Sequence, residues 1–239
     1  MKVETNNDLL KKWQQEIENL NPADIIKWAI NNFGASNLVF ASSLGIEDQI
    51  ITHIILNITK EIKIFTIDTG RMFQETYDLI ERTEERYNFK FHIYFPDYKD
   101  VEDMVSEKGI NLFYYSIENR KLCCKTRKIE PLQRALKGTN CWICGLRKEQ
   151  SITRENINAI EYDDVNGLYK LNPLFKWSLV QCWEYVKLNN IPVNNLYNKG
   201  FPSIGCMPCT RAVKKGEDIR AGRWWWENPE HKECGLHKR

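Results

Sequence analysis

The sequence predicts an α/β protein built on a parallel sheet that helices cover on both faces. Three short stretches with strand character, residues 37–43, 62–68 and 89–96, alternate with stretches of helical periodicity. Each is a run of mostly apolar residues, which is typical of strands that are buried on both faces. A chain of 239 residues is long enough to bury one substantial core around such a sheet.

Two helices are expected before the first strand. Residues 9–20 repeat apolar side chains at helical spacing. Residues 21–34 begin with Asn21 as a suitable N-cap and Pro22 at the first helical position, and they stop at Gly34. These signals predict two short helices at the start of the chain.

The predicted order then continues as strand, helix, strand, helix, strand, with the helices at residues 49–58 and 72–88. From about residue 99 the pattern changes. The elements expected there are a helix at 101–116, a basic helical region at 118–136, a strand within 140–151, and a strand followed by a helix within 169–192, with Ser178 as its N-cap. Regular periodicity is lost after residue 213, so we expect residues 1–215 to form one domain and residues 216–239 a mobile C-terminal segment.

Charge and composition narrow the function classes. The net charge of +2 gives no support for nucleic-acid binding. The first 20 residues are polar and amphipathic, unlike a secretion signal, and no apolar run reaches the ~18–20 residues that a membrane span needs. We therefore expect a cytoplasmic protein that binds neither nucleic acid nor membrane. In that reducing compartment its eight cysteines, all in the second half of the chain, indicate metal binding or redox chemistry rather than disulfides.

A turn of small residues, SSLGIED, follows the first predicted strand. Its Ser42, Ser43 and Gly45 can offer backbone amides and hydroxyls to a phosphate at a helix N-terminus. Asp68 ends the next strand and can accept a ribose hydroxyl. Because ligands bind at the carboxyl ends of parallel strands, the two turns together predict a nucleotide site. The stretch is neither a Walker A loop nor a dinucleotide fingerprint, and a plain strand-to-helix turn is the alternative.

The cysteines allow more than one four-thiol site. Cys206 and Cys209 form one CxxC pair, and Cys141 and Cys144 form another. About 60 residues separate the two pairs, far from the ~15–20 of zinc ribbons, so the alternative joins Cys206 and Cys209 to the tandem cysteines at 123–124. Four thiolates suit zinc or a [4Fe–4S] cluster, and the pattern does not choose between them. A CxxC pair can also be a redox pair.

A third group of residues is basic. Arginine forks match the oxygens of phosphate and sulfate, so these residues are candidates for binding an anionic ligand: Arg127, Lys128, Arg147, Arg154, Arg220 and Arg223. Arg223 directly precedes three tryptophans, which are too apolar for an open surface and predict that this stretch packs down. A solvated basic helix face is the alternative, and it is the better interpretation for Lys137 and Lys148.

Together these motifs resemble the sulfonucleotide reductases, the family of adenylylsulfate and phosphoadenylylsulfate reductases. The resemblance covers most of the chain and rests on SSLGIEDQ, DTGRMFQETY, CCKTRKIEPLQRAL, WICGLRKEQS, GCMPCT, GRWWWE and ECGLH, in that order. The CC and CxxC motifs are similar to those of the branch that contains an iron–sulfur cluster and typically uses adenylylsulfate. The family fold is a PP-loop type (adenine nucleotide alpha hydrolase-like) α/β sheet, which agrees with the strand and helix pattern.

The resemblance implies roles for individual residues. The four ligands of a [4Fe–4S] cluster match Cys123, Cys124, Cys206 and Cys209, and the nucleophile matches Cys234. The cations around the phosphosulfate match Lys128, Arg220 and Arg223. The segments that line the nucleotide pocket contain Ser42, Ser43, Asp68, Thr69, Gly70 and Gly145. The family usually has threonine where this chain has Cys144, so Cys141 and Cys144 are expected to be buried thiols, with an extra redox pair as the alternative; Cys182 is expected to pack in the core.

The resemblance also implies the reaction, which is reduction of adenylylsulfate (APS) to sulfite and AMP in sulfate assimilation. Cys234 attacks the sulfur atom, AMP leaves, and thioredoxin or a similar dithiol releases sulfite from the S-sulfocysteine. Phosphoadenylylsulfate (PAPS), or both nucleotides, stays open as the substrate. A PP-loop ATP pyrophosphatase and a zinc-stabilised nucleic-acid-binding protein are weaker alternatives. A homo-oligomer is compatible with the sequence.

Overall fold

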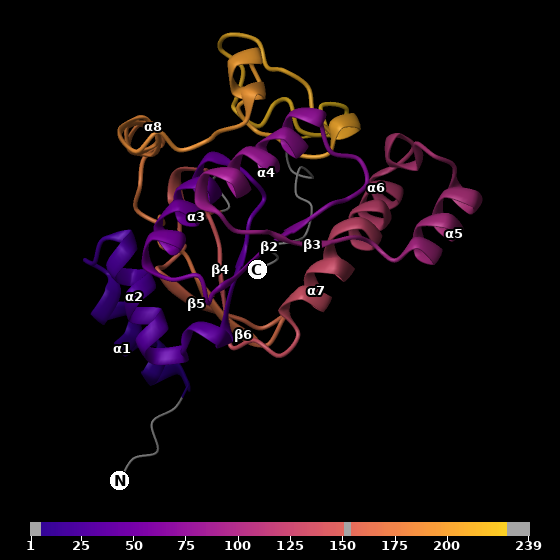
Figure 1. The fold of residues 1–239 in the computed structure, drawn as a ribbon. Coiled ribbons are helices and arrows are strands. Elements are labelled where there is room, and N and C mark those ends of the chain that lie inside the picture. The colour runs from indigo at the N-terminus through magenta and orange to yellow at the C-terminus, as the bar shows by residue number, and fades with distance from the viewer. Residues whose placement is uncertain (1–5, 151–153, 229–239) are drawn as a thin grey trace.

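The computed structural model describes residues 6–150 and 154–228 (Figure 1). Its centre is a six-stranded sheet in the order β3-β2-β1-β4-β6-β5. The strands are β1 (Leu38–Ala41), β2 (Lys63–Ile67), β3 (His92–Tyr94), β4 (Cys141–Ile143), β5 (Ile160–Asp163) and β6 (Leu168–Leu171). Neighbouring strands pair in parallel except β5 and β6, which are antiparallel.

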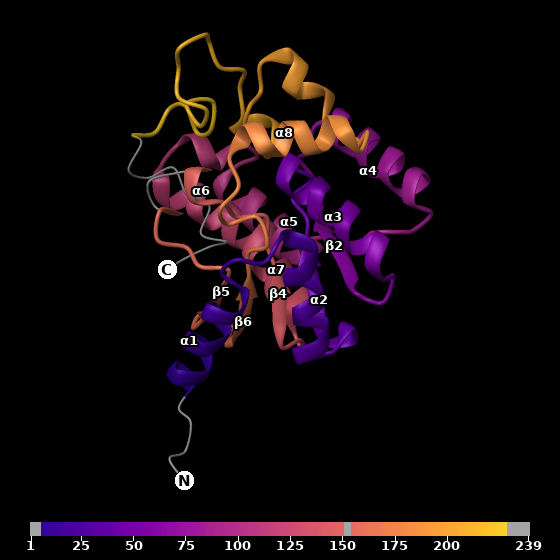
Figure 2. The same ribbon diagram turned by 90° about the vertical axis from the view of Figure 1, so that its left-hand side faces the viewer.

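Helices cover both faces of this sheet. They are α1 (Asn6–Ile17), α2 (Pro22–Phe33), α3 (Ile46–Ile58), α4 (Gln74–Tyr87), α5 (Tyr98–Lys108), α6 (Ile117–Cys124), α7 (Glu130–Leu136) and α8 (Leu179–Leu188). Helices α2, α3 and α4 lie on one side of the sheet, and α5, α6 and α7 lie on the other (Figures 1 and 2). The predicted parallel α/β sheet flanked by helices is confirmed.

Local signals explain where several helices begin and end. The Asn21 side chain accepts a hydrogen bond from the Asp24 amide, and Pro22 is the first residue of α2. Helix α8 begins with a capping box, in which Ser178 and Gln181 each bind the other's backbone amide. These caps lie at the predicted positions because each depends on residues only a few places apart.

The structure differs from the sequence prediction in three elements. The helix predicted at 101–116 ends earlier, because Gly109 adopts a left-handed φ of 90° after the last turn of α5. The helical region at 118–136 is divided by a π-helical turn, Lys125–Ile129. Strand β5 was not predicted, because an edge strand with one buried face gives no continuous apolar run.

The core lies where the central strands meet the helices. Leu38, Phe40, Ile143 and Leu171 are each less than 1% exposed. The carboxyl ends of β1, β2 and β4 therefore open at one edge of a rigid sheet, and the connections after them form the candidate site. Within the described residues, no helix has both the length and the apolar character to cross a membrane.

Candidate active site

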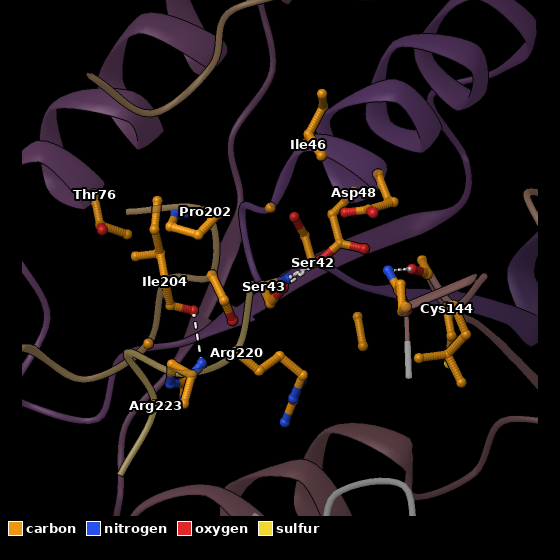
Figure 3. A pocket seen from close by; sticks show the side chains of 18 of the residues that line it. Ser42, Ser43, Ile46, Asp48, Thr76, Cys144, Pro202, Ile204, Arg220 and Arg223 are labelled. Carbon is orange, nitrogen blue, oxygen red and sulfur yellow. Dashed lines mark hydrogen bonds between the residues drawn. The ribbon is translucent and has the colours of Figure 1, made fainter. Parts of the chain in front are cut away.

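A cavity of about 540 Å³ lies at the carboxyl ends of β1, β2 and β4. Ala41, Ile67 and Cys144, at or just after the ends of these strands, line it on the side of the sheet. Residues from the segment 200–224 also line it. Figure 3 shows Ser43 between Asp48 on one side and the two arginines, Arg220 and Arg223, on the other. This is the position at which parallel α/β sheets bind ligands, and the volume suits a nucleotide.

The turn after β1 is held by its own side chains. The Leu44 amide donates to the Ser42 hydroxyl at 3.2 Å, and Leu44 has a left-handed φ of 63°. The amide and the hydroxyl of Ser43 both donate to Asp48 Oδ2, each at 2.6 Å. The Ile46 amide, at the start of α3, donates to the Tyr197 hydroxyl at 3.0 Å. The sequence suggested that the amides of this turn would be available to a phosphate. In the structure the Ser43 amide already donates its hydrogen bond to Asp48.

Asp48 is a buried carboxyl group against the cavity wall. Burial raises the pKa of Asp48 to about 7, although the two hydrogen bonds from Ser43 oppose that rise. A Cβ atom on Gly145 would lie 2.0 Å from Asp48 Oδ1, so only glycine fits there. Gly145 therefore belongs to the cavity wall as predicted, and Asp48 is a neighbour that sequence spacing did not single out.

Asp48→Asn should change how stability depends on pH. The pKa of Asp48 is higher in the folded state than in the unfolded state, so the folded protein keeps a proton that the unfolded chain releases between about pH 4 and pH 7. That contribution to stability is full below about pH 4 and is lost as the pH rises to 7, by up to about 4 kcal/mol. Asparagine cannot ionise, so the variant should gain stability relative to the wild type at pH 8 compared with pH 5.

Urea unfolding at both pH values measures this difference. Asp103→Asn is the matched control, because Asp103 is exposed on α5. Its unfolding free energy should follow the wild type at both pH values. Parallel pH profiles for Asp48→Asn and the wild type would contradict the assignment of a raised pKa to Asp48.

The turn after β2 contributes one of its three predicted residues to the cavity. Thr69 lines it, but Asp68 and Gly70 are not among the lining residues in the described part of the chain. Asp68 Oδ1 instead accepts hydrogen bonds from the Gly70 amide at 2.7 Å and the Tyr77 hydroxyl at 3.0 Å. Asp68 therefore holds the turn through Oδ1, and the expectation that it accepts a ribose hydroxyl stays a prediction.

Three predicted cations reach the cavity: Lys128, Arg220 and Arg223 all line it. Arg223 is buried, donates to the Ile204 carbonyl at 3.1 Å and lies over the Trp224 ring. Trp224 thus packs down beside Arg223 as expected, whereas Trp225 is 40% exposed, so the prediction holds for only part of the tryptophan stretch.

Two other basic residues lie at the opposite end of the cavity. Arg147 is paired with Glu47 at 2.8 Å, and Arg154 donates to Gln150. The charge of Arg147 is thus balanced by the protein itself. The cations best placed to meet an anionic group therefore come from the π-turn and from residues 220–223.

The four predicted cluster cysteines line a second, smaller cavity next to the first. Cys206 and Cys209 flank a 3₁₀ turn, in which side chains three residues apart point the same way. Cys123 and Cys124 end α6 and are both buried. The neighbouring thiols of the tandem pair thus border one cavity, although adjacent residues on a helix point in different directions.

The surroundings of the four thiols fit an iron–sulfur cluster. Trp224 Nε1 is buried beside them and has no hydrogen-bond acceptor among the described residues, so a bound sulfide or thiolate would supply one. The side chains of Arg71, Arg127 and Lys128 line the same cavity and can offset the charge of the thiolates, whereas Arg120, which also lines it, is paired with Glu227. Within residues 6–150 and 154–228, no three His, Cys, Asp or Glu side chains gather around one metal ion. In a [4Fe–4S] cluster each thiolate binds a different iron, so such convergence is not required.

The thiols of this group have different acidities. Burial raises the pKa of Cys209 to about 12, reinforced by the nearby thiol of Cys206. Burial also raises the pKa of Cys206, but the charge of Lys128, the Thr69 hydroxyl and the charge of Arg223 outweigh it and hold that pKa below its ordinary value. Cys206 is thus the thiol whose thiolate the protein itself stabilises most clearly.

The two cavities share a wall. Lys128, Cys206 and Trp224 line both of them. Thr69 joins this wall because its hydroxyl lies 3.3 Å from Cys206 Sγ. A ligand at this end of the nucleotide cavity would therefore contact Lys128, which also lies beside Cys206 of the thiol group.

The remaining cysteines of the described residues are buried and unpaired by disulfides: Cys141, Cys144 and Cys182. Burial raises the pKa of Cys182 to about 12 and raises the pKa values of Cys141 and Cys144 further. Thiols that resist ionisation are poor nucleophiles, which favours the packing interpretation of all three over an extra redox pair.

The predicted nucleophile, Cys234, lies outside the described residues. Within the described part of the C-terminal segment, residues 216–228, the stretch 222–224 is buried against the rest of the protein. Trp224 is 1% exposed, and Glu227 pairs with the buried Arg120 at 2.7 Å. Sequence reasoning missed Arg120 and Glu227, because nothing in the spacing indicates that residues 107 positions apart will meet.

Known proteins are similar to this chain in both sequence and fold. The phosphoadenosine phosphosulfate reductase domain matches residues 37–212. Adenosine 5'-phosphosulfate reductase of Allochromatium vinosum is 52% identical over 203 residues, covering 85% of this chain and 79% of that protein. The protein of the same name from Burkholderia cepacia is 49% identical over 198 residues, covering 83% of this chain and 79% of that protein.

Solved structures agree. Phosphoadenylyl-sulfate (PAPS) reductase from Candida auris, in a phosphate complex, matches with a TM-score of 0.75 and 29% identity, covering 88% of this chain and 99% of that one. Candida glabrata FMN adenylyltransferase matches with a TM-score of 0.58 and 18% identity, covering 97% and 81%, a likeness in fold alone. The predicted PP-loop-type fold is thereby confirmed. The chain belongs to the phosphoadenosine phosphosulfate reductase domain family and is a sulfonucleotide reductase.

Proposed function

We propose that this protein reduces adenylylsulfate to sulfite and AMP, with Cys234 as the nucleophile and thioredoxin or a similar dithiol as the reductant. The observation that carries the proposal is the wall shared by the two cavities. There Lys128 stands between a nucleotide-sized cavity and four thiols, with Arg220 and Arg223 also lining that cavity. Three cations in one place suit the phosphosulfate, the most highly charged part of the substrate.

The reaction divides into three displacements at sulfur. The Cys234 thiolate forms a bond to the sulfur of adenylylsulfate, the bond from sulfur to the phosphate oxygen breaks, and AMP leaves with that electron pair. The partner's thiolate then attacks Cys234 Sγ, and sulfite leaves. The partner's second thiol resolves the mixed disulfide, so the dithiol supplies both electrons and becomes a disulfide.

The role of the protein is mainly electrostatic. An anionic thiolate must approach an anionic sulfonate, so Lys128, Arg220 and Arg223 have to neutralise charge on the phosphate and sulfonate oxygens. Gly145 leaves room for the nucleotide at the far end of the cavity, where a larger side chain would collide with Asp48. Thr69 and the turn at Ser42 and Ser43 shape the walls in between.

A [4Fe–4S] cluster held by Cys123, Cys124, Cys206 and Cys209 completes the proposal. When bound, the cluster supplies an electrostatic and structural contribution to the shared wall, since the dithiol already supplies both electrons. Lys128 stabilises the Cys206 thiolate, and the same ammonium group can face the substrate. Protein purified under anaerobic conditions should be brown, with a broad absorption band near ~400 nm.

Adenylylsulfate is favoured over phosphoadenylylsulfate for two reasons. The relatives of about 50% identity carry the name adenosine 5'-phosphosulfate reductase, and the chain has the paired cysteines of the cluster-containing branch. We place the reaction in sulfate assimilation in the cytoplasm, where a reduced dithiol protein is available.

The test is sulfite release from each nucleotide with reduced thioredoxin. We expect kcat/KM to be at least about tenfold higher for adenylylsulfate, a difference of about 1.4 kcal/mol in transition-state binding. A preference for phosphoadenylylsulfate would overturn the substrate assignment but keep the reaction. Sulfite release from neither nucleotide, with the cluster band present, would overturn the proposed reaction itself.

A further inference from the structure

A buried ion pair fastens the described end of the chain, next to the packing of Trp226 against Phe113 and Tyr114. Arg120 on α6 donates from Nε to Glu227 Oε1 at 2.9 Å and from Nη2 to Glu227 Oε2 at 2.7 Å. The two side chains are 0% and 3% exposed. A bidentate pair of this kind fixes orientation as well as distance, and burial protects it from screening by salt.

Arg120 also contacts the thiol group and the tryptophan stretch. Its guanidinium lies 4.9 Å from the Trp224 ring centroid, and it hydrogen-bonds to the Cys124 thiol. Burial lowers the pKa of Arg120, but the hydrogen bond and charge of Glu227, together with Cys124, outweigh it and raise that pKa. One side chain therefore connects a cysteine of the thiol cavity, the tryptophan stretch and Glu227.

We propose that Arg120 and Glu227 form a clamp that positions Cys234 for its attack by fixing the C-terminal segment to α6 beside the shared wall. The clamp is a pair of positioning residues that act through Cys234, and this inference rests on the proposed function. Cys234 follows Glu227 by seven positions, so it can lie at most about 25 Å from the clamp.

The part of the segment before the clamp has its own attachments. The Trp224 amide donates to the Cys209 carbonyl at 3.1 Å, and Arg223 pairs with Thr210 in a short antiparallel bridge. Loss of the clamp should therefore leave Arg220, Arg223 and the nucleotide cavity in place. It should loosen residues 225–228, which would then be held mainly by the packing of Trp225 and Trp226 against Tyr114, and so reorient the chain that leads to Cys234.

Glu227→Gln tests the clamp, because it keeps the shape of the side chain but leaves the buried Arg120 charge without its carboxylate. In single-turnover experiments with the holoenzyme, saturating adenylylsulfate and no reductant, we expect sulfonation of Cys234 to slow at least about threefold, since effective concentration falls with tether length. Affinity for AMP should stay within about twofold of the wild type. Amide hydrogen exchange in residues 225–228 should become faster.

Glu217→Gln is the matched control. Glu217 pairs with Arg211 in the same part of the chain, but both side chains are about one-third exposed. This variant should keep the wild-type sulfonation rate and the wild-type exchange in residues 225–228. If Glu227→Gln does not yield folded protein, Glu227→Asp, which retracts the carboxylate by one methylene, replaces it.

The outcomes separate the clamp from the proposed function. Unchanged sulfonation and exchange in Glu227→Gln would overturn the clamp, and so would a slower rate that comes with an equal loss of AMP affinity. If the wild type itself forms no sulfonated Cys234, the proposed function fails. Exchange in residues 225–228 still decides whether the ion pair holds the segment.

Discussion

Cys234→Ser is expected to lower sulfite release at least about 10,000-fold, because a serine hydroxyl at neutral pH is a far weaker nucleophile than a cysteine thiolate. The same variant should form no sulfonated enzyme when it is incubated with adenylylsulfate alone. Mass spectrometry of the intact protein detects that adduct directly, and a sulfite assay measures turnover.

The rest of the machinery should survive this substitution. AMP affinity and the cluster absorption band should equal those of the wild type, since Cys234 contributes to neither in the proposed mechanism. Cys182→Ala is the matched control, because its thiol is buried in the core and outside both cavities. That variant should lose some stability and keep the reaction. Wild-type turnover in Cys234→Ser would end the assignment of the nucleophile.

Gly145→Ala is expected to weaken AMP binding at least about 100-fold and to lower the melting temperature. The new Cβ would lie 2.0 Å from Asp48 Oδ1, closer than real contacts allow, and 3.1 Å from Glu47 Cβ, which is a tight contact. Asp48 is the atom group that has to move, but its two hydrogen bonds to Ser43 hold it. Relief of the collision therefore distorts the turn after β1, and overpacking of this kind typically costs about 1–3 kcal/mol.

Calorimetry of AMP binding and thermal unfolding measure both effects. Asp48→Ala combined with Gly145→Ala removes the obstructing carboxylate and should recover much of the lost melting temperature. Gly45→Ala is the steric control: a Cβ there meets no atom closer than 3.6 Å, so we expect a loss of under about 1 kcal/mol. Equal losses in Gly45→Ala and Gly145→Ala would show that the contact with Asp48 is not the cause.

The sequence predicted what depends on neighbours in the chain. The caps at Asn21 and Ser178 are local, as are the apolar runs of the central strands, and these features appear where expected. The two CxxC motifs could not be distinguished in this way, because the choice depends on which cysteines share a cavity. The resemblance to a known family, rather than spacing, pointed to the tandem pair.

What the sequence did not predict depends on tertiary contacts. The hydrogen bonds from the Gly70 amide and the Tyr77 hydroxyl to Asp68 Oδ1 were not foreseen, and the contact of Asp68 with a ribose stays a prediction. From the sequence Asp48 is an ordinary acid in the first turn of a helix, and only its burial in the fold raises its pKa. The ligand assignments of Cys123, Cys124, Cys206 and Cys209, and the role of Cys234, stay predictions.

The π-helical turn at Lys125–Ile129 limits which mutations this stretch of the chain can tolerate during evolution. A π-turn holds one residue more than an α-helical turn, and this one lies between the tandem cysteines and Pro131. Deleting a single codon here would allow a regular α-helix, but Lys128 would then lie one residue closer to the tandem cysteines and would lose the spacing that the π-turn gives it. We therefore expect point substitutions in this turn to be inherited far more readily than deletions. In a homologue, a one-residue alignment gap at this point would mark the loss of the π-turn that places a lysine at both cavities.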